Sequence, residues 1–143
     1  MGVSVQQSES GQVLAWAAIL LPLLLALVGL VFDGGLMFAQ FRRARWAADG
    51  AAVAAASEID VELFAERGQV RLKPDAVGVA QAYGRQNDPD LHITGVHVAN
   101  NVIYVQGWVQ VEPVFLGLFG VGDLSLQVRG RERPAWGISE EGQ

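Results

Sequence analysis

The sequence predicts an α+β protein: a long N-terminal helix, membrane-spanning or bundled, followed by a small domain of one helix on a three-stranded antiparallel sheet. The first observation is an apolar stretch without a charge, residues 13–32, which continues without a helix break into an alanine-rich tract that ends near residue 57. The second is a change beyond residue 90 from helical spacing to strict alternation of apolar and polar residues. Such a stretch of about twenty residues just spans a hydrocarbon core of roughly 30 Å.

The long helix is expected over residues 12–57, as both membrane anchor and assembly helix, after an N-terminal tail or leader of residues 1–11. At 1.5 Å per residue it would extend roughly 65 to 70 Å, about twice what a bilayer covers, so its second half needs another partner. Small residues there form two adjacent flat stripes, which let helices approach closely. The stripes are Ala44, Ala48, Ala52 and Ala56, and Ala47, Ala51 and Ala55. We expect them to pack in a bundle of neighbouring copies; packing on the chain's own C-terminal domain is the alternative.

Two residues of this helix are singular. Pro22 removes one backbone hydrogen bond and can bend the helix, which membrane helices tolerate. Asp33 lies at the end of the apolar stretch, where a carboxylate can reach the membrane interface. It is expected either to mark this boundary or, once helices bundle, to pair with an arginine of a neighbouring copy. The candidate arginines are Arg42, Arg43 and Arg45.

A linker is expected over residues 58–74, because Gly68 and Lys73-Pro74 interrupt the helix, and the outer domain over residues 75–133. Asp75 can cap a helix that ends near Gln86. Residues 91–98 and 103–111 form a predicted hairpin across Asn100-Asn101, with a bulge at Gly95, and residues 124–129 form the third strand. Residues 134–143 are the expected C-terminal tail.

The connection before the third strand, residues 113–122, is too short to span a membrane and too apolar for a free surface turn. Exposed contiguous apolar area usually marks contact with a partner or a lipid surface. The alternative is that these side chains close the domain's own core. The predicted contact residues are Phe115, Leu116, Leu118 and Phe119.

Composition excludes several functions. A net charge of −5 and a sequence pI near 4.9 provide no basic field for nucleic acid. The absence of cysteine excludes disulfides, thiolate catalysis and cysteine metal sites. His92 and His97 are expected on opposite faces of a strand unless the bulge restores their phase, and Asp88 and Asp90 are expected turn formers. We therefore expect no catalytic, metal or cofactor site, and no enzyme.

The N-terminal segment resembles that of TadE/TadG-like proteins of tight-adherence (Flp-type) pilus systems. The residues that carry the resemblance are Gly11-Gln12-Val13 before a leucine-rich segment, Leu21-Pro22-Leu23-Leu24 within it, Asp33-Gly34 at its exit, Arg42-Arg43, and the tract from Ala47-Ala48-Asp49-Gly50 to Ala56. The resemblance covers the first forty percent of the chain well. Beyond it, the order of helix, hairpin, apolar loop and final strand is similar to a TadE-type C-terminal region more loosely.

The resemblance implies a pilin-like structural subunit, with copies of itself, other pilus components and the inner membrane as partners, and with the outer domain exported. The alternatives are a minor pilin or assembly factor, and a membrane-tethered module that binds an envelope ligand. Gly11 and Gln12 are the candidate processing site, although Trp16 stands where prepilin-type processing usually has glutamate. Residues 1–11 carry no Lys or Arg, so the positive-inside rule alone would reverse the implied topology.

Overall fold

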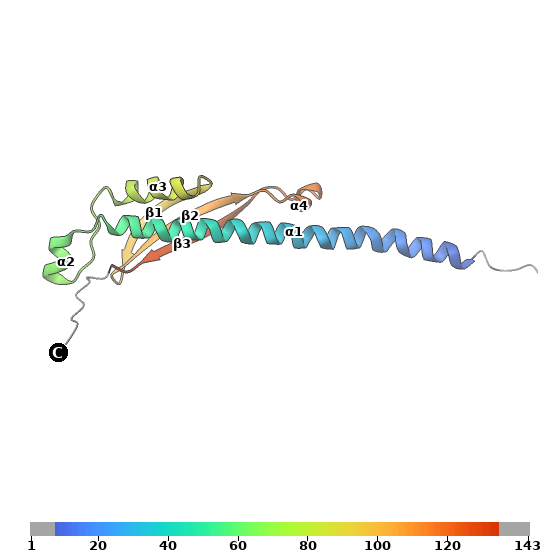
Figure 1. The fold of residues 1–143 in the computed structure, drawn as a ribbon, viewed down its shortest axis with the longest axis horizontal. Helices are drawn as coiled ribbons and strands as arrows, with labels where there is room; N and C mark the ends of the chain where they lie inside the picture. Colours follow the sequence, from blue (N-terminus) through green and yellow to red (C-terminus); the bar gives the residue numbers. More distant parts are fainter. Residues whose placement is uncertain (1–7, 135–143) are drawn as a thin grey trace, which may run out of the picture. The chain divides into compact units, whose positions relative to one another are not determined.

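A computed structural model describes residues 8–134 of the chain. In order along the chain the elements are α1 (Ser8–Ala56), α2 (Val61–Arg67), α3 (Ala76–Asn87), β1 (Leu91–Ala99), β2 (Val102–Val111), α4 (Phe115–Leu118) and β3 (Leu124–Glu132) (Figure 1). They fall into two compact units. The helix–loop unit comprises described residues 8–37 and 112–122, and the sheet unit comprises described residues 38–111 and 123–134. The α+β class and the long N-terminal helix are confirmed.

The sheet of the sheet unit is antiparallel in the order β1-β2-β3. The hairpin turn lies where the sequence predicts it, with positive φ at Asn100 (53°) and Asn101 (58°), a backbone region that Asn tolerates. The register between β1 and β2 shifts between Ile93 and Gly95, so the predicted bulge is also confirmed. It restores the phase of β1: Ile93 pairs with Gly107 and Val96 with Val105, and both of these residues are buried.

Two helices cover one face of this sheet. Gly84 of α3 lies so close to Ile93 that an added Cβ would be 2.6 Å from its Cδ1, and a Cβ on Gly130 of β3 would overlap the Ala48 carbonyl oxygen of α1. Figure 1 shows both helices running along the strands. The core between them contains the inward side chains of all three strands, among them Leu91, Ile93, Ile103, Val105, Val109, Val111 and Val128.

The segment expected as a linker contains more structure than predicted. Asp60 begins α2, its side chain accepting a hydrogen bond from the Leu63 N–H at 3.1 Å, and Gly68 ends the helix with a φ of 63°. Ile59 and Leu72 form an isolated antiparallel bridge. Asp75 precedes α3 as predicted, but its side chain makes no capping hydrogen bond. The C-terminal tail, apart from Pro134, and residues 1–7 of the N-terminal tail lie outside the described residues.

Candidate functional site

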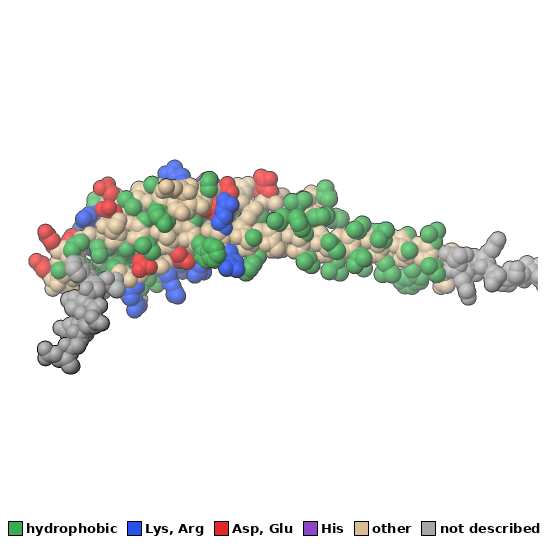
Figure 2. All heavy atoms as spheres, viewed as in Figure 1, with side chains coloured by type: hydrophobic (Ala, Val, Ile, Leu, Met, Phe, Trp, Pro, Cys, Tyr) green, Lys and Arg blue, Asp and Glu red, His purple; other side chains and the backbone are tan. Residues whose placement is uncertain are grey.

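The N-terminal part of α1 presents large apolar side chains around its whole circumference. Over Gly11–Ala56 the helix is long and apolar enough to cross a membrane, with a mean hydropathy of 2.6 in its most apolar window. Figure 2 shows hydrophobic side chains along this part of α1, and Leu21, Leu24 and Leu27 are exposed. Pro22 lies within the helix without ending it. This segment fits a membrane-anchored protein.

Asp33 holds the apolar loop of the helix–loop unit. One carboxylate oxygen accepts hydrogen bonds from the N–H groups of Val114 (2.9 Å) and Phe115 (3.1 Å), and the other from that of Leu116 (2.6 Å). The side chain is fully buried. The chain's own loop therefore binds and covers the Asp33 carboxylate. Its expected roles as a membrane-boundary marker and as the partner of an arginine in a neighbouring copy stay predictions.

The apolar loop packs on α1 beside this carboxylate. The Phe115 ring meets the Phe32 ring edge to face, with centroids 5.6 Å apart, and lies where a Cβ on Gly29 would be 2.7 Å from Phe115 Cγ. Leu118 and Phe119 remain 80% and 73% exposed. The alternative, that the loop closes the core of the outer domain, does not hold for Phe115, because this side chain packs on Gly29 and Phe32 of α1. The expected contact patch stays a proposal.

The alanine stripes are covered by the chain's own sheet unit. Ala44, Ala47, Ala48, Ala51, Ala52 and Ala55 are all buried, and Ala56 is partly buried. Gly130 of β3 meets the backbone of Ala48, and Asp49 accepts a hydrogen bond from the Arg131 N–H of the same strand at 3.1 Å. The prediction that neighbouring copies cover these stripes is corrected. Small side chains let a sheet approach as closely as they would let another helix.

The arginines of α1 have separate roles. Arg43 donates to Asp88 at 2.8 Å and approaches Asp90 at 3.6 Å, which ties α1 to the turn between α3 and β1. Arg45 approaches Asp49 at 3.8 Å. The Arg42 guanidinium lies over the rings of Phe38 (5.8 Å) and Trp46 (4.9 Å). We define Phe38, Arg42, Trp46 and Val53 as the outward stripe: all four are exposed, at near-helical spacing.

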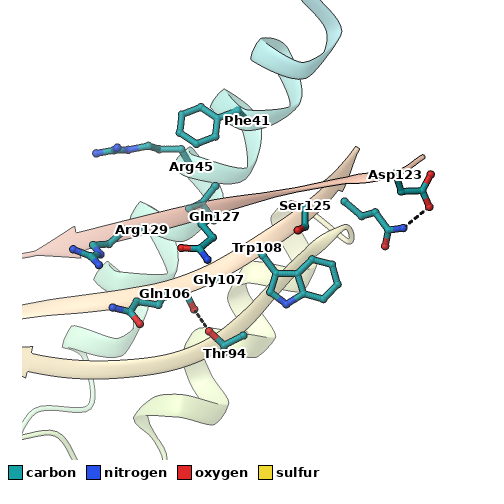
Figure 3. Close-up of a pocket in the computed structure, with 12 residues that line it drawn as sticks. Phe41, Arg45, Thr94, Gln106, Gly107, Trp108, Asp123, Ser125, Gln127 and Arg129 are labelled. Carbon is teal, nitrogen blue, oxygen red and sulfur yellow. Dashed lines mark hydrogen bonds between the residues drawn. The ribbon is translucent and has the colours of Figure 1, made fainter. Parts of the chain in front are cut away.

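The face of the sheet away from α1 and α3 is open, polar and aromatic. His92 stacks on Trp108 and His97 on Tyr104, because the bulge puts both histidines on this face. A hollow of about 900 Å³ extends from Trp108 to α1 (Figure 3). Its lining comprises Phe41, Arg45, Thr94, Gln106, Gly107, Trp108, Gln110, Asp123, Ser125, Gln127, Val128 and Arg129. The hollow offers amide, hydroxyl and guanidinium groups to a ligand.

Among the described residues no group of three or more histidine, aspartate or glutamate side chains could hold a metal ion. Gly11 and Gln12 lie within α1. Processing between them stays a prediction.

No curated protein and no solved structure matches the chain. Residues 11–58 match the family model described as "Putative Flp pilus-assembly TadE/G-like". The matched part contains the Asp33 carboxylate, the arginines and the alanine tract, so this segment of the chain is similar to the TadE/G-like pilus-assembly family.

Proposed function

We propose that the chain is a pilin-like structural subunit of a Tad-type pilus, assembled through α1, with the inner membrane holding it before assembly and the sheet unit exported. Its partners would be further copies of itself and other pilus components. The observation that carries the proposal is the continuity of α1, which runs 49 residues. A tether needs only about twenty residues to cross the bilayer.

The contacts of α1 restrict which surface neighbouring copies can use. The alanine stripes are occupied, whereas the side chains of residues 13–32 contact few described groups and the outward stripe is exposed. Helices associate in lipid by close packing and in water by burying apolar area. Assembly would therefore use residues 13–32 of α1 together with Phe38, Trp46 and Val53.

Two alternatives remain. A minor pilin or assembly factor would share the fold and the membrane anchor but be rare in, or absent from, the filament. A membrane-tethered binding module is favoured by the hollow beside Trp108, whose polar lining suits a ligand with hydroxyl groups. An enzyme is not proposed, and no cofactor is implied.

The test is mass spectrometry of filaments sheared from cells that carry the chain, compared with cells lacking it. The proposal expects the chain as a major filament component and no filaments after its deletion. Loss of filaments with the chain absent from the sheared fraction would identify an assembly factor. Unchanged filaments would contradict any pilus role and favour the binding module.

A double substitution, Phe38→Ala with Trp46→Ala, examines the outward stripe. Both side chains are exposed, so we expect the free energy of unfolding to change by no more than about 0.5 kcal/mol. Filament yield should fall strongly, since each subunit loses two aromatic contacts. Gln127→Ala, exposed on the open sheet face, is the matched control and should leave the yield unchanged. Normal yield for the double variant would place the assembly surface elsewhere.

A further inference from the structure

We propose that residues 113–121, the Asp33 loop, form a second membrane-inserted element, which enters the lipid beside α1 and is held there by the Asp33 carboxylate. The proposal rests on the membrane anchoring that is part of the proposed function. The partner of the loop's exposed surface is lipid. Its exposed side chains would contact acyl chains and the headgroup boundary of the same bilayer that α1 crosses.

The position of Phe115 along α1 sets the depth of the loop. Phe115 packs on Gly29 and Phe32, which both belong to the apolar stretch expected to span the membrane. Gly29 lies three residues inside the end of that stretch at Phe32, about 4.5 Å at 1.5 Å per residue. Elements that lie in the membrane interface bury their apolar face by about 5 to 10 Å. A residue that packs on Gly29 is therefore close to the shallow end of this interfacial range.

The exposed side chains of the loop are apolar and therefore compatible with contact with lipid. Val114, Leu118, Phe119 and Val121 are exposed, and residues 113–122 contain no charged side chain. If this surface faced water it would form a contiguous apolar patch, which soluble surfaces rarely carry without a partner. Since its support is the membrane helix itself, the bilayer that surrounds the helix also covers the loop.

Several backbone N–H groups of the loop donate hydrogen bonds within the protein, which favours its insertion into lipid. Irregular backbone at membrane depth is tolerated where protein groups satisfy its polar atoms. The Asp33 carboxylate accepts hydrogen bonds from the N–H groups of Val114, Phe115 and Leu116. The N–H groups of Phe119 and Val121 donate to the Leu116 carbonyl and that of Gly120 to the Gly117 carbonyl. The same contacts explain how a carboxylate can be buried at the end of the apolar stretch, because three N–H donors replace the water that would otherwise solvate it.

Site-directed spin labelling tests the proposal on the full chain in phospholipid vesicles, because the sequence contains no cysteine and each substitution gives a unique thiol. Leu118→Cys and Phe119→Cys carry the reporting labels on exposed positions. Leu27→Cys is the control inside the apolar stretch, and Ser125→Cys on the open sheet face is the control in water. Collision rates are measured with oxygen, which concentrates in lipid, and with a water-soluble nickel chelate.

The proposal expects labels at 118 and 119 to be accessible to oxygen and protected from nickel, as at 27. Nickel accessibility equal to that at 125 would overturn it. Protection from both reagents that grows with the number of chains per vesicle would also overturn it, by assigning the surface to a second copy. Water accessibility at 27 would instead refute the membrane anchoring itself, which separates failure of the proposed function from failure of the loop.

The role of Asp33 is read from the same label at 118. In Asp33→Ala the three N–H groups lose their acceptor, and the label should move from lipid-like to water-like collision rates while the label at 27 stays unchanged. Asp33→Asn keeps one carbonyl oxygen and should give an intermediate shift. Unchanged depth at 118 in both variants would overturn the assignment of Asp33 as the group that holds the loop.

Discussion

The two ends of α1 are both rich in apolar residues but present side chains of very different size. In residues 13–32 leucine, valine and phenylalanine surround the helix and remain exposed, whereas between Ala44 and Ala55 the buried positions are alanine. Lipid is fluid and accommodates large side chains at any angle, while a sheet that packs on a helix needs a flat surface. Side-chain size, as well as hydropathy, therefore distinguishes the part of the helix that is proposed to meet lipid from the part that meets protein.

Ala48→Leu should have the largest effect on the sheet unit. Ala48 is fully buried and its carbonyl lies against Gly130, so neither partner can move aside easily. Overpacking of this kind typically costs about 1 to 3 kcal/mol, which lowers a small domain's melting temperature by roughly 5 to 20 °C. Thermal unfolding of the full chain in detergent, followed by near-ultraviolet circular dichroism, measures it. Val53→Leu, exposed on the same helix, is the control; equal effects at both positions would contradict the packing.

Arg43→Ala should have an intermediate effect. It leaves the Asp88 carboxylate, which is 2% exposed, without its charged donor. Because the Arg43 side chain is itself 58% exposed, the loss should be modest, about 1 to 2 kcal/mol. Denaturant unfolding compares this variant with Arg42→Ala, which should cost less than about 0.5 kcal/mol. A larger loss for Arg42 would show that the aromatic contacts, not the ion pair, stabilise this part of α1.

Leu24→Ala should have the smallest effect on the sheet unit. We expect its free energy of unfolding to change by no more than about 0.5 kcal/mol, because Leu24 is exposed within residues 13–32 of α1. Insertion should also persist, since the remaining stretch stays strongly apolar. The melting temperature in detergent and the membrane fraction of the expressed chain are the two readouts. A drop comparable to that of Ala48→Leu would remove the distinction between the two parts of the helix.

Local chemistry made much of the fold predictable. The period of two, the Asn100-Asn101 turn and the phase slip at Gly95 each depend on neighbouring residues, and they predicted the hairpin and its bulge. The helix α2 was missed because its few apolar residues, such as Leu63 and Phe64, are mixed with acids in a segment too short to show a period.

The site was harder to predict, because its partners are distant in sequence. Asp33 and the loop are separated by about eighty residues, and no periodicity or motif connects them. The alanine stripes correctly indicated close packing, but flat surfaces suit a sheet and a helix alike, so the partner could not be read from them. Gly130, whose missing side chain admits the backbone of α1, was the available signal for the sheet.

Thiol labelling of two adjacent positions in α1 tests most directly the claim that the chain's own sheet unit covers the alanine stripes. Ala52→Cys and Val53→Cys are prepared in nanodiscs that hold one chain each, which removes neighbouring copies, and the rate of maleimide labelling is measured. Ala52 is fully buried and Val53 is exposed. If exposing residue 52 requires an opening of about 3 kcal/mol, its thiol should react roughly a hundredfold more slowly than that at 53. Equal rates would contradict the account and return the stripes to neighbouring copies.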